Sequence, residues 1–482
     1  MNQAIEATLV GEGDKLRQVL TVIDENGLGL ALIVSQHKKL LGLVTDGDIR
    51  RALLKGYDLD VPVQKIMNSK PVTVSNKIPR DQVFRLMNEG IRQIPVVDDQ
   101  GKVCDLVCFT ELYKKVPWAI PYIGEEELNE VMGAIQDSWI TMGPRVERLE
   151  RVISDYLGVK HAIAVSSGTA ALDVALKALG VGPGDEVILP AFTYIATANS
   201  VLYQHARPVL ADVDPKTYNV NPEEVIKRIT PKTKCIMSID YGGQSADYDS
   251  LLGIAKRHGL YLVEDGAPSL GGEYKGRKLC SFGDISTVSL HAAKVITSAE
   301  GGMVLTNDDG LATRARIVRN QGEDPTQKYL HILVGHNYRM TDLHAAVGLA
   351  QFTRLSDILK IRAEIATYYS KNLAELCEGV VLPYTVPGNK HAWFLYPILL
   401  KERDKVAEYL RQKGIDTRVS WPLPINKQPV YRGLLDQVEY PVAEQIAGSI
   451  LNLPIYYKMT KEEQDYTIIH LKDAVGAAAR ES

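Results

Sequence analysis

The chain has 482 residues, of which 45% are hydrophobic and 24% charged, and its formal net charge is −4. This composition is typical of a soluble globular protein of two or three domains, and the absence of a long basic run argues against a nucleic-acid partner. No apolar stretch approaches the ~18–20 residues that a membrane span needs, and the start, MNQAIEATLV, lacks the features of a signal peptide. We therefore expect a cytoplasmic protein without a membrane partner.

The five cysteines do not form a disulfide framework for a chain of this length. Cys104 and Cys108 are four residues apart, but no histidine or second cysteine pair lies close in sequence to complete a zinc site. We interpret them as ordinary buried thiols and expect no metal.

Two segments in the first quarter of the chain align without gaps at an offset of 63 residues. Residues 32–53 read LIVSQHKKLLGLVTDGDIRRAL, and residues 95–116 read PVVDDQGKVCDLVCFTELYKKV. In each, a β-branched run meets a polar turn, a second apolar run follows, and a helix then begins. An amphipathic helical stretch, DKLRQVLTVIDENG or RDQVFRLMNEG, precedes each segment. The repeat predicts two βαββα-like halves that bury their sheets against one another.

Residues 1 to about 115 resemble a tandem pair of CBS domains through GLVTDGDIRRALLKG and KIMNSKPVTV. CBS pairs commonly bind adenine nucleotides through a Thr-x-x-Asp pattern at the start of the last helix. The first repeat has Thr45 and Asp48 there, so a hydroxyl could bond phosphate and a carboxylate could take ribose hydroxyls. The second repeat has Cys108 and Glu111, which weakens that half-site. The alternatives are a plain helix cap for Thr45 and Asp48, and a role for the pair in dimerisation alone.

The chain changes character after residue 115, where Pro117 and Pro121 interrupt the stretch VPWAIPYIGEEELNEVM. We place a domain boundary there, after residues 1–116. From about residue 160 to 350, strand-like runs alternate with helical ones, as in HAIAVSS followed by GTAALDVALKALG. This alternation predicts parallel βαβ units in a sheet that is covered on both faces, with ligands at the carboxyl ends of the strands.

Candidate binding residues follow three of these strands. Gly168 and Thr169, in SSGTAAL, open a helix and offer backbone N–H groups that suit a phosphate, although Ser-Gly-Thr is also a plain capping sequence. Tyr194, in PAFTY, could stack on a flat ring or belong to the core. Asp265 ends the apolar strand YLVED, where a buried carboxylate needs either a protonated ring nitrogen or a structural arginine or lysine as its partner.

Ser289 and Lys294 follow the strand ISTVSL. With the residues above they supply a phosphate cradle, a stacking ring, an anion for a ring nitrogen, and an amine. Pyridoxal 5′-phosphate (PLP) requires this set, because the amine forms a Schiff base with its aldehyde and the carboxylate keeps its ring nitrogen protonated. A single lysine is ordinarily a solvated surface charge, but the ordered set makes Lys294 the candidate catalytic residue.

From about residue 118 to 482 the chain resembles the DegT/StrS-type sugar aminotransferases, a branch of the fold-type I PLP enzymes. The matching stretches include SWITMGPRVERLE, SLHAAK, EGGMVLTND, HNYRMTDLHAAVGLAQ and LNLPIYYKMT. The resemblance implies an α/β fold with a large, mostly parallel sheet domain at residues 117–354. A small C-terminal α/β domain at residues 355–482 is expected to follow, and the CBS pair at residues 1–116 precedes both.

The resemblance also implies a role for each residue of the set. Lys294 is similar to the Schiff-base lysine and Asp265 to the partner of the ring nitrogen. The remaining assignments are stacking for Tyr194 and phosphate binding for Gly168, Thr169 and Ser289. Asn337, in HNYRMTD, is similar to the asparagine that reaches the phosphate from the neighbouring subunit, which implies a homodimer or a higher homo-oligomer.

Two further positions, Arg339 and Pro268, concern substrate and cofactor binding. Arg339 is a candidate for binding an anionic group of the substrate, or else a solvated or ion-paired arginine. The family usually has glutamine three residues after the aspartate, where this chain has Pro268. Proline cannot donate a hydrogen bond to the ring hydroxyl, so that contact is lost or comes from elsewhere.

The resemblance implies a PLP-dependent aminotransferase that moves an amino group from L-glutamate to a keto group of a nucleotide-linked, 6-deoxy sugar for surface polysaccharide or glycan biosynthesis. Some relatives replace the lysine by histidine and act as dehydratases, so Lys294 favours transamination. Two alternatives remain open. One is a PLP-dependent keto-sugar dehydratase or cyclitol aminotransferase, and the other is a regulatory protein whose CBS pair senses adenine nucleotides.

Overall fold

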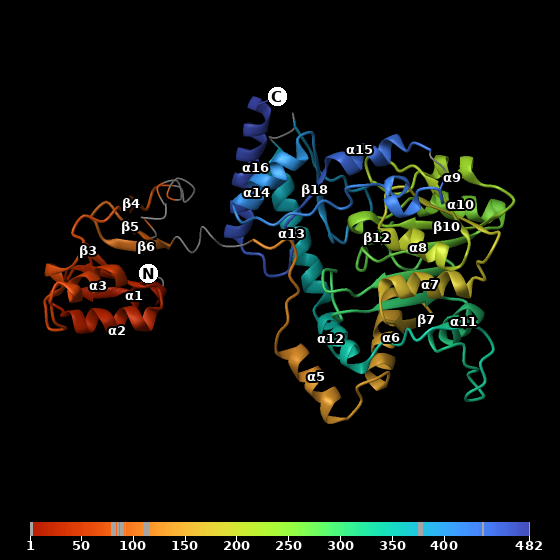
Figure 1. The fold of residues 1–482 in the computed structure, drawn as a ribbon, viewed down its shortest axis with the longest axis horizontal. Helices are drawn as coiled ribbons and strands as arrows, with labels where there is room; N and C mark the ends of the chain where they lie inside the picture. The colour runs from red at the N-terminus through yellow and green to blue at the C-terminus, as the bar shows by residue number, and fades with distance from the viewer. Residues whose placement is uncertain are drawn as a thin grey trace. The chain divides into compact units, whose positions relative to one another are not determined.

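The structure is a computed structural model that describes residues 3–78, 83, 86, 91, 93–108, 116–374, 379–435 and 438–481. It divides into two compact units, Met1–Lys115 and Val116–Ser482, and Figure 1 shows the elements of each. No helix among the described residues is long and apolar enough to cross a bilayer.

The first unit contains two three-stranded sheets, each with one parallel and one antiparallel pair of neighbours. Its elements are α1 (Gln3–Glu6), β1 (Leu9–Gly11), α2 (Leu16–Asn26), β2 (Leu30–Val34), β3 (Leu40–Thr45), α3 (Asp46–Leu54), η1 (Val63–Lys65), β4 (Val74–Ser75), β5 (Gln93–Val97) and β6 (Val103–Cys108). Strands β5 and β6 begin 63 residues after β2 and β3, which is the offset of the sequence repeat. The register irregularity also recurs, between Ile33 and Val34 in one sheet and between Val96 and Val97 in the other.

One apolar cluster contains residues of both sheets, among them Leu30 and Leu32 from the first and Val103 and Leu106 from the second. The order β1–α2–β2–β3–α3 is the βαββα unit that the sequence predicts, and the shared cluster confirms that the two halves bury their sheets against one another. In the second half, most of the helix expected near residues 80–90 lies outside the described residues, as does Glu111.

The second unit is built on a seven-stranded sheet in the order β7-β15-β14-β11-β10-β8-β9, in which β15 runs opposite to the other six strands. Its strands are β7 (His161–Val165), β8 (Glu186–Pro190), β9 (Arg207–Ala211), β10 (Thr233–Ile239), β11 (Tyr261–Asp265), β14 (Ile285–Ser289) and β15 (Gly302–Thr306). The accompanying elements are α5 (Glu125–Gln136), α6 (Pro144–Leu157), α7 (Gly168–Ala178), α8 (Ile195–Tyr203), α9 (Pro222–Arg228), η3 (Tyr241–Gly243), α10 (Tyr248–His258), β12 (Glu273–Tyr274), β13 (Arg277–Lys278), α11 (Asp309–Arg319) and α12 (Asp342–Thr353).

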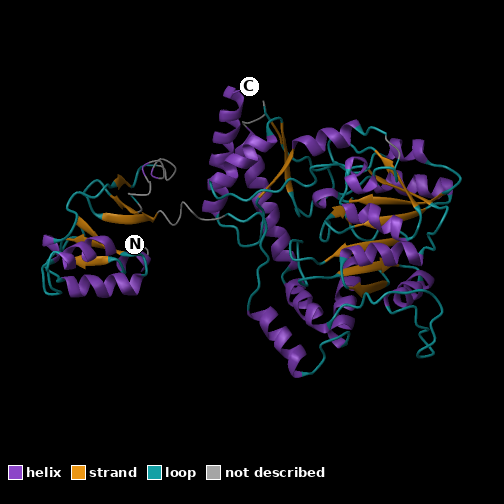
Figure 2. Ribbon diagram, viewed as in Figure 1, coloured by secondary structure: helices purple, strands orange, loops and turns teal. Residues whose placement is uncertain are grey.

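Helices cover both faces of this sheet (Figure 2) because its strands are apolar on both sides. Successive strand residues alternate between two large apolar clusters. In β7, Ile163 and Val165 belong to one cluster, whereas Ala162 and Ala164 belong to the other. The mostly parallel sheet confirms the predicted α/β class.

The C-terminal part of this unit carries a three-stranded antiparallel sheet, β16-β17-β18, whose residues share an apolar cluster with the helices beside it. The elements are α13 (Leu355–Leu373), β16 (Val380–Val381), β17 (Tyr396–Leu400), α14 (Arg403–Gln412), η5 (Ile425–Lys427), η6 (Pro429–Tyr431), α15 (Pro441–Ser449), β18 (Ile450–Leu453) and α16 (Lys461–Glu481). Arg354 lies between α12 and α13, at the position where the sequence predicts the division into a large and a small domain.

Candidate active site

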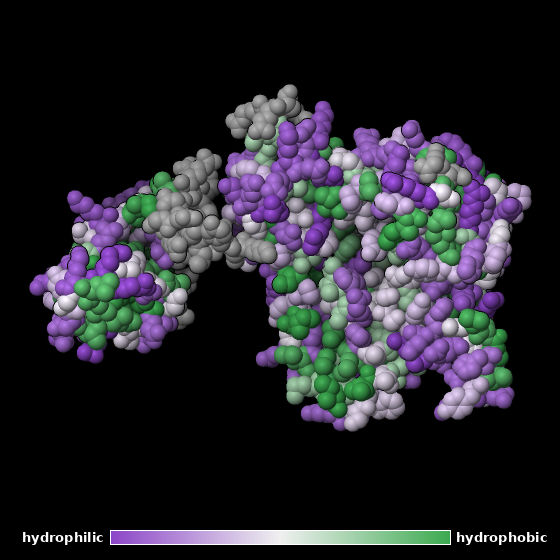
Figure 3. All heavy atoms as spheres, viewed as in Figure 1, coloured by the Kyte–Doolittle hydropathy of each residue, from purple (hydrophilic) through white to green (hydrophobic). Residues whose placement is uncertain are grey.

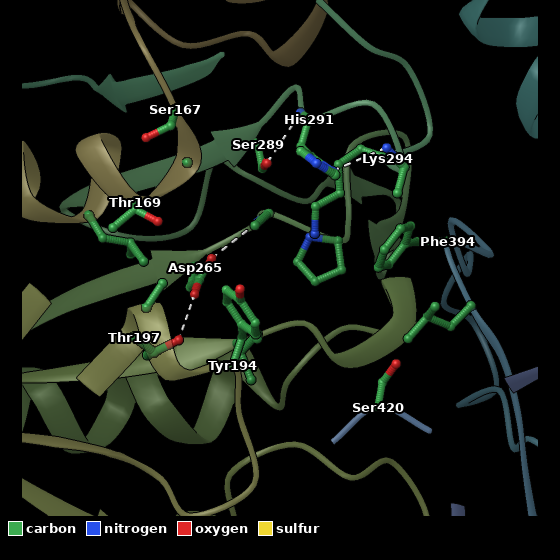
Figure 4. A pocket seen from close by; sticks show the side chains of 18 of the residues that line it. Ser167, Thr169, Tyr194, Thr197, Asp265, Ser289, His291, Lys294, Phe394 and Ser420 are labelled. Atoms are coloured by element: carbon green, nitrogen blue, oxygen red, sulfur yellow. Dashed lines mark hydrogen bonds between the residues drawn. The ribbon is translucent and has the colours of Figure 1, made fainter. Parts of the chain in front are cut away.

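A cavity of about 510 Å³ lies at the carboxyl ends of the strands of the large sheet. Its volume is in the range of a small-molecule site. Figure 4 shows side chains around it from the segments after β7 and β8, from the ends of β11 and β14, and from the more distant Phe394 and Ser420. Six residues that the sequence singles out line it together: Gly168, Thr169, Tyr194, Asp265, Ser289 and Lys294.

The N-terminus of α7 forms one wall of the cavity. Ser167 caps this helix, its Oγ accepting a hydrogen bond from the Ala170 amide at 3.1 Å. A Cβ atom on Gly168 would lie 2.8 Å from the Cβ of Ser289, so only glycine allows the helix end to approach that strand so closely. Backbone N–H groups at the positive end of the helix therefore face the cavity beside the Ser289 hydroxyl, which suits a phosphate group.

Asp265 is 3% exposed and lies at the floor of the cavity. Its Oδ1 accepts a hydrogen bond from the Ala267 amide at 3.2 Å, and its Oδ2 accepts one from Thr197 Oγ1 at 3.1 Å. Within the described residues it makes no ion pair, so no structural arginine or lysine neutralises it. Burial raises the pKa of Asp265, opposed by the Ala267 amide and the charge of Lys294.

Thr197 is a contact of Asp265 that the sequence interpretation missed. Its Oγ1 also lies 2.8 Å from Thr193 Oγ1. Because the Thr197 hydroxyl donates its hydrogen bond to the carboxylate, the Thr193 hydroxyl must be the donor in the pair of threonines. Thr197 follows Tyr194 by three residues, one turn into α8, and this helical spacing was the available signal.

Lys294 follows β14 in a turn, in which its amide donates to the His291 carbonyl at 2.9 Å. Burial lowers the pKa of Lys294 to about 8, and the charge of Asp265 opposes this shift. The Lys294 Nζ lies 4.3 Å from the centroid of the Phe394 ring and makes no hydrogen bond within the described part of the chain. An amine with a lowered pKa in a cavity is a suitable nucleophile at neutral pH.

Aromatic side chains form the wall opposite α7. The sequence interpretation predicted Tyr194 but missed the other rings, Trp118, Phe394 and Trp421. Tyr194 is 53% exposed, and its ring centroid lies 6.1 Å from that of Trp421. Phe394 meets Trp118 edge to face at 6.3 Å. Trp118, Phe394 and Trp421 are distant in sequence from the strand-end motifs, so no local pattern announces them.

Two predicted residues do not line this cavity. Asn337 is exposed, and Arg339 is half-buried with its guanidinium donating to Asn320 Oδ1 at 2.8 Å. Pro268, which stands where the family usually has glutamine, does line the cavity, so that position faces the site without a donor.

The candidate pair in the first unit forms a helix cap. Thr45 Oγ1 accepts from the Asp48 amide at 3.3 Å, and Asp48 Oδ2 accepts from the Thr45 amide at 2.9 Å and from its hydroxyl at 2.8 Å. Arg51 donates to the other carboxylate oxygen at 2.6 Å. The capping role that the sequence left open is therefore realised in the structure.

The large cavity fits PLP. Four features face one space: a buried carboxylate that forms no ion pair among the described residues, a helix end that only glycine can form, an exposed aromatic face and an amine of lowered pKa. Among the described residues, no cluster of three or more histidine, cysteine, aspartate or glutamate side chains is arranged to hold a metal ion.

Comparison with known proteins identifies both parts of the chain. Residues 121–472 match the DegT/DnrJ/EryC1/StrS aminotransferase family, and residues 5–55 and 63–117 match the CBS domain. The chain is 40% identical over 363 residues to a GDP-perosamine synthase of Caulobacter vibrioides, covering 74% of this chain and 97% of that protein. It is 36% identical over 316 residues to the UDP-2-acetamido-2-deoxy-3-oxo-D-glucuronate aminotransferase of Pseudomonas aeruginosa, covering 65% and 86%. A Streptococcus pneumoniae protein solved in a PLP form superposes with a TM-score of 0.72 at 29% identity, covering 75% and 99%.

Proposed function

Because the chain belongs to the DegT/DnrJ/EryC1/StrS aminotransferase family, we propose that it transfers an amino group from L-glutamate to a keto group of a nucleotide-linked, 6-deoxy sugar. The enzyme is a sugar-nucleotide aminotransferase, and its cofactor is PLP. The product would serve surface polysaccharide or glycan biosynthesis. The observation that carries the assignment of the site is the buried carboxylate of Asp265, which makes no ion pair within the described residues and shares one cavity with Lys294.

When bound, PLP supplies an aldehyde for an amine and a protonated ring that accepts electrons. In this proposal, the backbone N–H groups at Gly168 and Thr169 and the hydroxyl of Ser289 bind its phosphate. Tyr194 stacks on its ring, and Asp265 holds the proton on the ring nitrogen.

Lys294 is the proposed general base and acid. Its Nζ takes the proton from the α-carbon of the amino donor and later returns a proton to the carbon that receives the amino group. A pKa of about 8 suits both directions, because the amine can be neutral or protonated near neutral pH at little cost. The aromatic wall of Phe394 and Trp421 limits water around this proton transfer.

The proposed assembly is a homodimer in which Asn337 reaches the phosphate bound by the neighbouring subunit. Its exposure outside the cavity of its own chain supports this role. Helix α5 and the residues after it also expose an apolar stripe, visible over α5 in Figure 3, that a second copy would cover. Its members are 49–59% exposed: Leu128, Met132, Ile135 and Trp139.

Two further proposals concern the surroundings of the enzyme. An adenine nucleotide at Thr45 and Asp48 of the CBS pair would regulate the enzyme, provided that the ligand replaces the hydrogen bonds of the cap. The cytoplasm is the proposed compartment. It is supported by the free thiols of Cys104, Cys235 and Cys280.

The test is an amination assay with the full-length chain and L-glutamate. The acceptors are a panel of GDP- and UDP-linked sugars with a keto group at C3 or C4, because the two named relatives act on GDP- and UDP-linked sugars. We expect one acceptor to be converted to an amino sugar with release of an equal amount of 2-oxoglutarate. Loss of a hydroxyl group from the sugar without consumption of glutamate would instead indicate a dehydratase.

The Lys294→Ala variant is expected to lose catalytic turnover and the visible absorbance of the lysine-linked cofactor. Lys256→Ala, which removes an exposed lysine from α10, is the matched control and should retain both. If Lys294→Ala turned over like the control, the assignment of the catalytic lysine would be wrong.

A further inference from the structure

The wall of the cavity beside Lys294 is made by a short segment that we call the strap, residues 391–395. The Ala392 amide donates to the Gly243 carbonyl at 2.9 Å, and the Leu395 amide donates to the Gly242 carbonyl at 3.0 Å. A Cβ atom on Gly243 would lie 3.0 Å from the Ala392 Cβ and from the Trp393 amide nitrogen. The strap is therefore fixed tightly against the turn that follows β10.

A buried cation holds the strap from its other side. Arg362 of α13 is 4% exposed, and its Nη1 donates to the Trp393 carbonyl at 2.9 Å and lies 3.5 Å from the Phe394 carbonyl. It makes no ion pair within the described residues, and its Nε has no hydrogen-bond partner there. A buried guanidinium without an anionic partner is costly, so its position calls for a compensating role. The two carbonyls of the strap are its observed contacts.

The strap presents the face of one ring to the catalytic amine. The Phe394 ring centroid lies 4.3 Å from the Lys294 Nζ, well within the ~6 Å range of a cation–π contact. No hydrogen-bond acceptor within the described residues competes for this amine. The ring favours the ammonium form because its face is electron-rich, whereas burial favours the neutral amine.

From this geometry we propose that Phe394 is a positioning residue for the amine of Lys294, and that Arg362 fixes the strap that carries it. The proposal rests on the proposed function, in which Lys294 moves the proton. The ring gives the unlinked amine a fixed resting place in the cavity and keeps its pKa from falling further. Arg362 acts only through the strap and does not touch the reacting atoms.

The other titratable groups around Lys294 do not account for this contact. Asp265 on β11, Tyr194 before α8, and His291 and Glu300 in the loop between β14 and β15 line the same cavity. These four side chains remain in place when Phe394 is substituted, so their charges do not explain a change in the pKa of Lys294 between the variants. His391, in the strap itself, is uncharged, because burial lowers its pKa to about 3 and its Nδ1 accepts from the Trp393 amide at 2.8 Å.

The test measures the pKa of Lys294 directly in the full-length chain freed of cofactor. Pulses of acetic anhydride across a pH series label neutral amines, and mass spectrometry of the peptide containing Lys294 gives its midpoint. We expect a midpoint near 8 in the unchanged chain. Phe394→Leu keeps an apolar side chain but removes the ring, and should move the midpoint down by about half to one and a half units.

Two controls isolate the ring. Phe394→Tyr keeps an aromatic face and should leave the midpoint unchanged. Phe352→Leu removes a ring that contacts Tyr156 outside the cavity, and should also leave it unchanged. An equal midpoint in Phe394→Leu and Phe394→Tyr would overturn the role of Phe394. The proposed function would still stand, because it is tested by Lys294→Ala.

The role of Arg362 is tested by a double-mutant cycle in the same measurement. Arg362→Met should lower the midpoint in the same direction as Phe394→Leu, and the double variant should show no added shift. Arg362→Lys keeps the charge without the fork of donors and should lower the midpoint by a smaller amount. It provides the test if Arg362→Met folds poorly. Additive shifts, or a midpoint near 8 in both Arg362 variants, would show that Arg362 does not act through Phe394.

Discussion

The two candidate sites of this chain differ in how far their polar groups satisfy one another. In the first unit, Asp48 accepts hydrogen bonds from Thr45 and from Arg51, so both of its oxygens are occupied by neighbours on the same helix. In the second unit, Asp265 is buried with two neutral hydrogen-bond donors and makes no ion pair with any described residue. Within the described part of the chain, the Lys294 amine makes no hydrogen bond and lies over the face of the Phe394 ring. A folded protein normally avoids such an arrangement, because a buried charge without a partner is costly.

This difference teaches which kind of site a structure without ligands can reveal. Groups that remain unpaired in a cavity indicate the chemistry of the missing partner, here a protonated ring nitrogen and an aldehyde. Groups that pair with each other are consistent with a structural role alone. Three substitutions can break or sharpen this comparison.

The largest effect is expected for Asp265→Asn. The amide has nearly the shape of the carboxylate but cannot stabilise a proton on the ring nitrogen. We therefore expect turnover to fall by about 10²–10³-fold, the loss typical of removing one electrostatic contact at a reacting centre. Cofactor should still bind, and its absorbance spectrum together with single-turnover rates would measure both properties.

Asp240→Asn is the matched control for this prediction. Asp240 directly follows the neighbouring strand β10 and is as deeply buried as Asp265. Its carboxylate accepts hydrogen bonds from the Tyr248 and Ser269 hydroxyls, outside the cavity. Burial and then the charge of Glu264 raise the pKa of Asp240 well above its usual value. Asp240→Asn therefore replaces a second buried carboxylate with an amide of nearly the same shape, at a position that does not line the cavity. Equal losses in the two variants would mean that Asp265 matters only for folding.

An intermediate effect is expected for Gly168→Ala. The added Cβ would lie 2.8 Å from the Cβ of Ser289, so the start of α7 must move away from β14. Overpacking of this kind costs about 1–3 kcal/mol. Some of that cost should appear as roughly tenfold weaker cofactor binding, measured by titrating the cofactor-free chain with PLP.

Gly253→Ala serves as the control for the glycine substitution. Gly253 lies within α10. Apart from its chain neighbours and the backbone of its own helix, no described atom lies within 4 Å of its added Cβ, and alanine favours a helix. It should leave cofactor affinity unchanged and raise stability slightly. Unchanged affinity in Gly168→Ala would show that the phosphate does not bind at this helix end.

The strand-end motifs were predictable from the sequence because strand, turn and helix follow one another within a few residues. Gly168, Asp265 and Ser289 needed only the rule that ligands gather at the carboxyl ends of parallel strands. Each half of the repeat in the first unit is also a pattern of neighbouring residues. The offset of 63 residues between the halves gives the correct positions of both strand pairs.

The remaining features depend on packing between distant segments. Phe394 contacts Lys294 from the strap, 100 residues later in the chain. The strap in turn accepts a hydrogen bond from Arg362 of α13, a third segment. The lowered pKa of Lys294 results from burial by these segments, which no local motif encodes. Asn337 remains exposed in a single chain, so its proposed contact requires a second subunit.

The smallest effect is expected for Thr45→Ala, which probes the satisfied side of the comparison. Losing the cap should cost about 1 kcal/mol of local stability in α3, because the Asp48 amide loses its acceptor. Faster hydrogen exchange of the amides in α3 would measure this loss. Without nucleotide, the amination rate should equal that of the unchanged chain.

Repeating the exchange measurements with AMP or ATP separates the two roles of Thr45, helix capping and nucleotide binding. A nucleotide that protects α3 in the unchanged chain but not in Thr45→Ala would mean that this residue binds ligand as well as capping the helix. Equal exchange in both chains, with and without nucleotide, would contradict both roles.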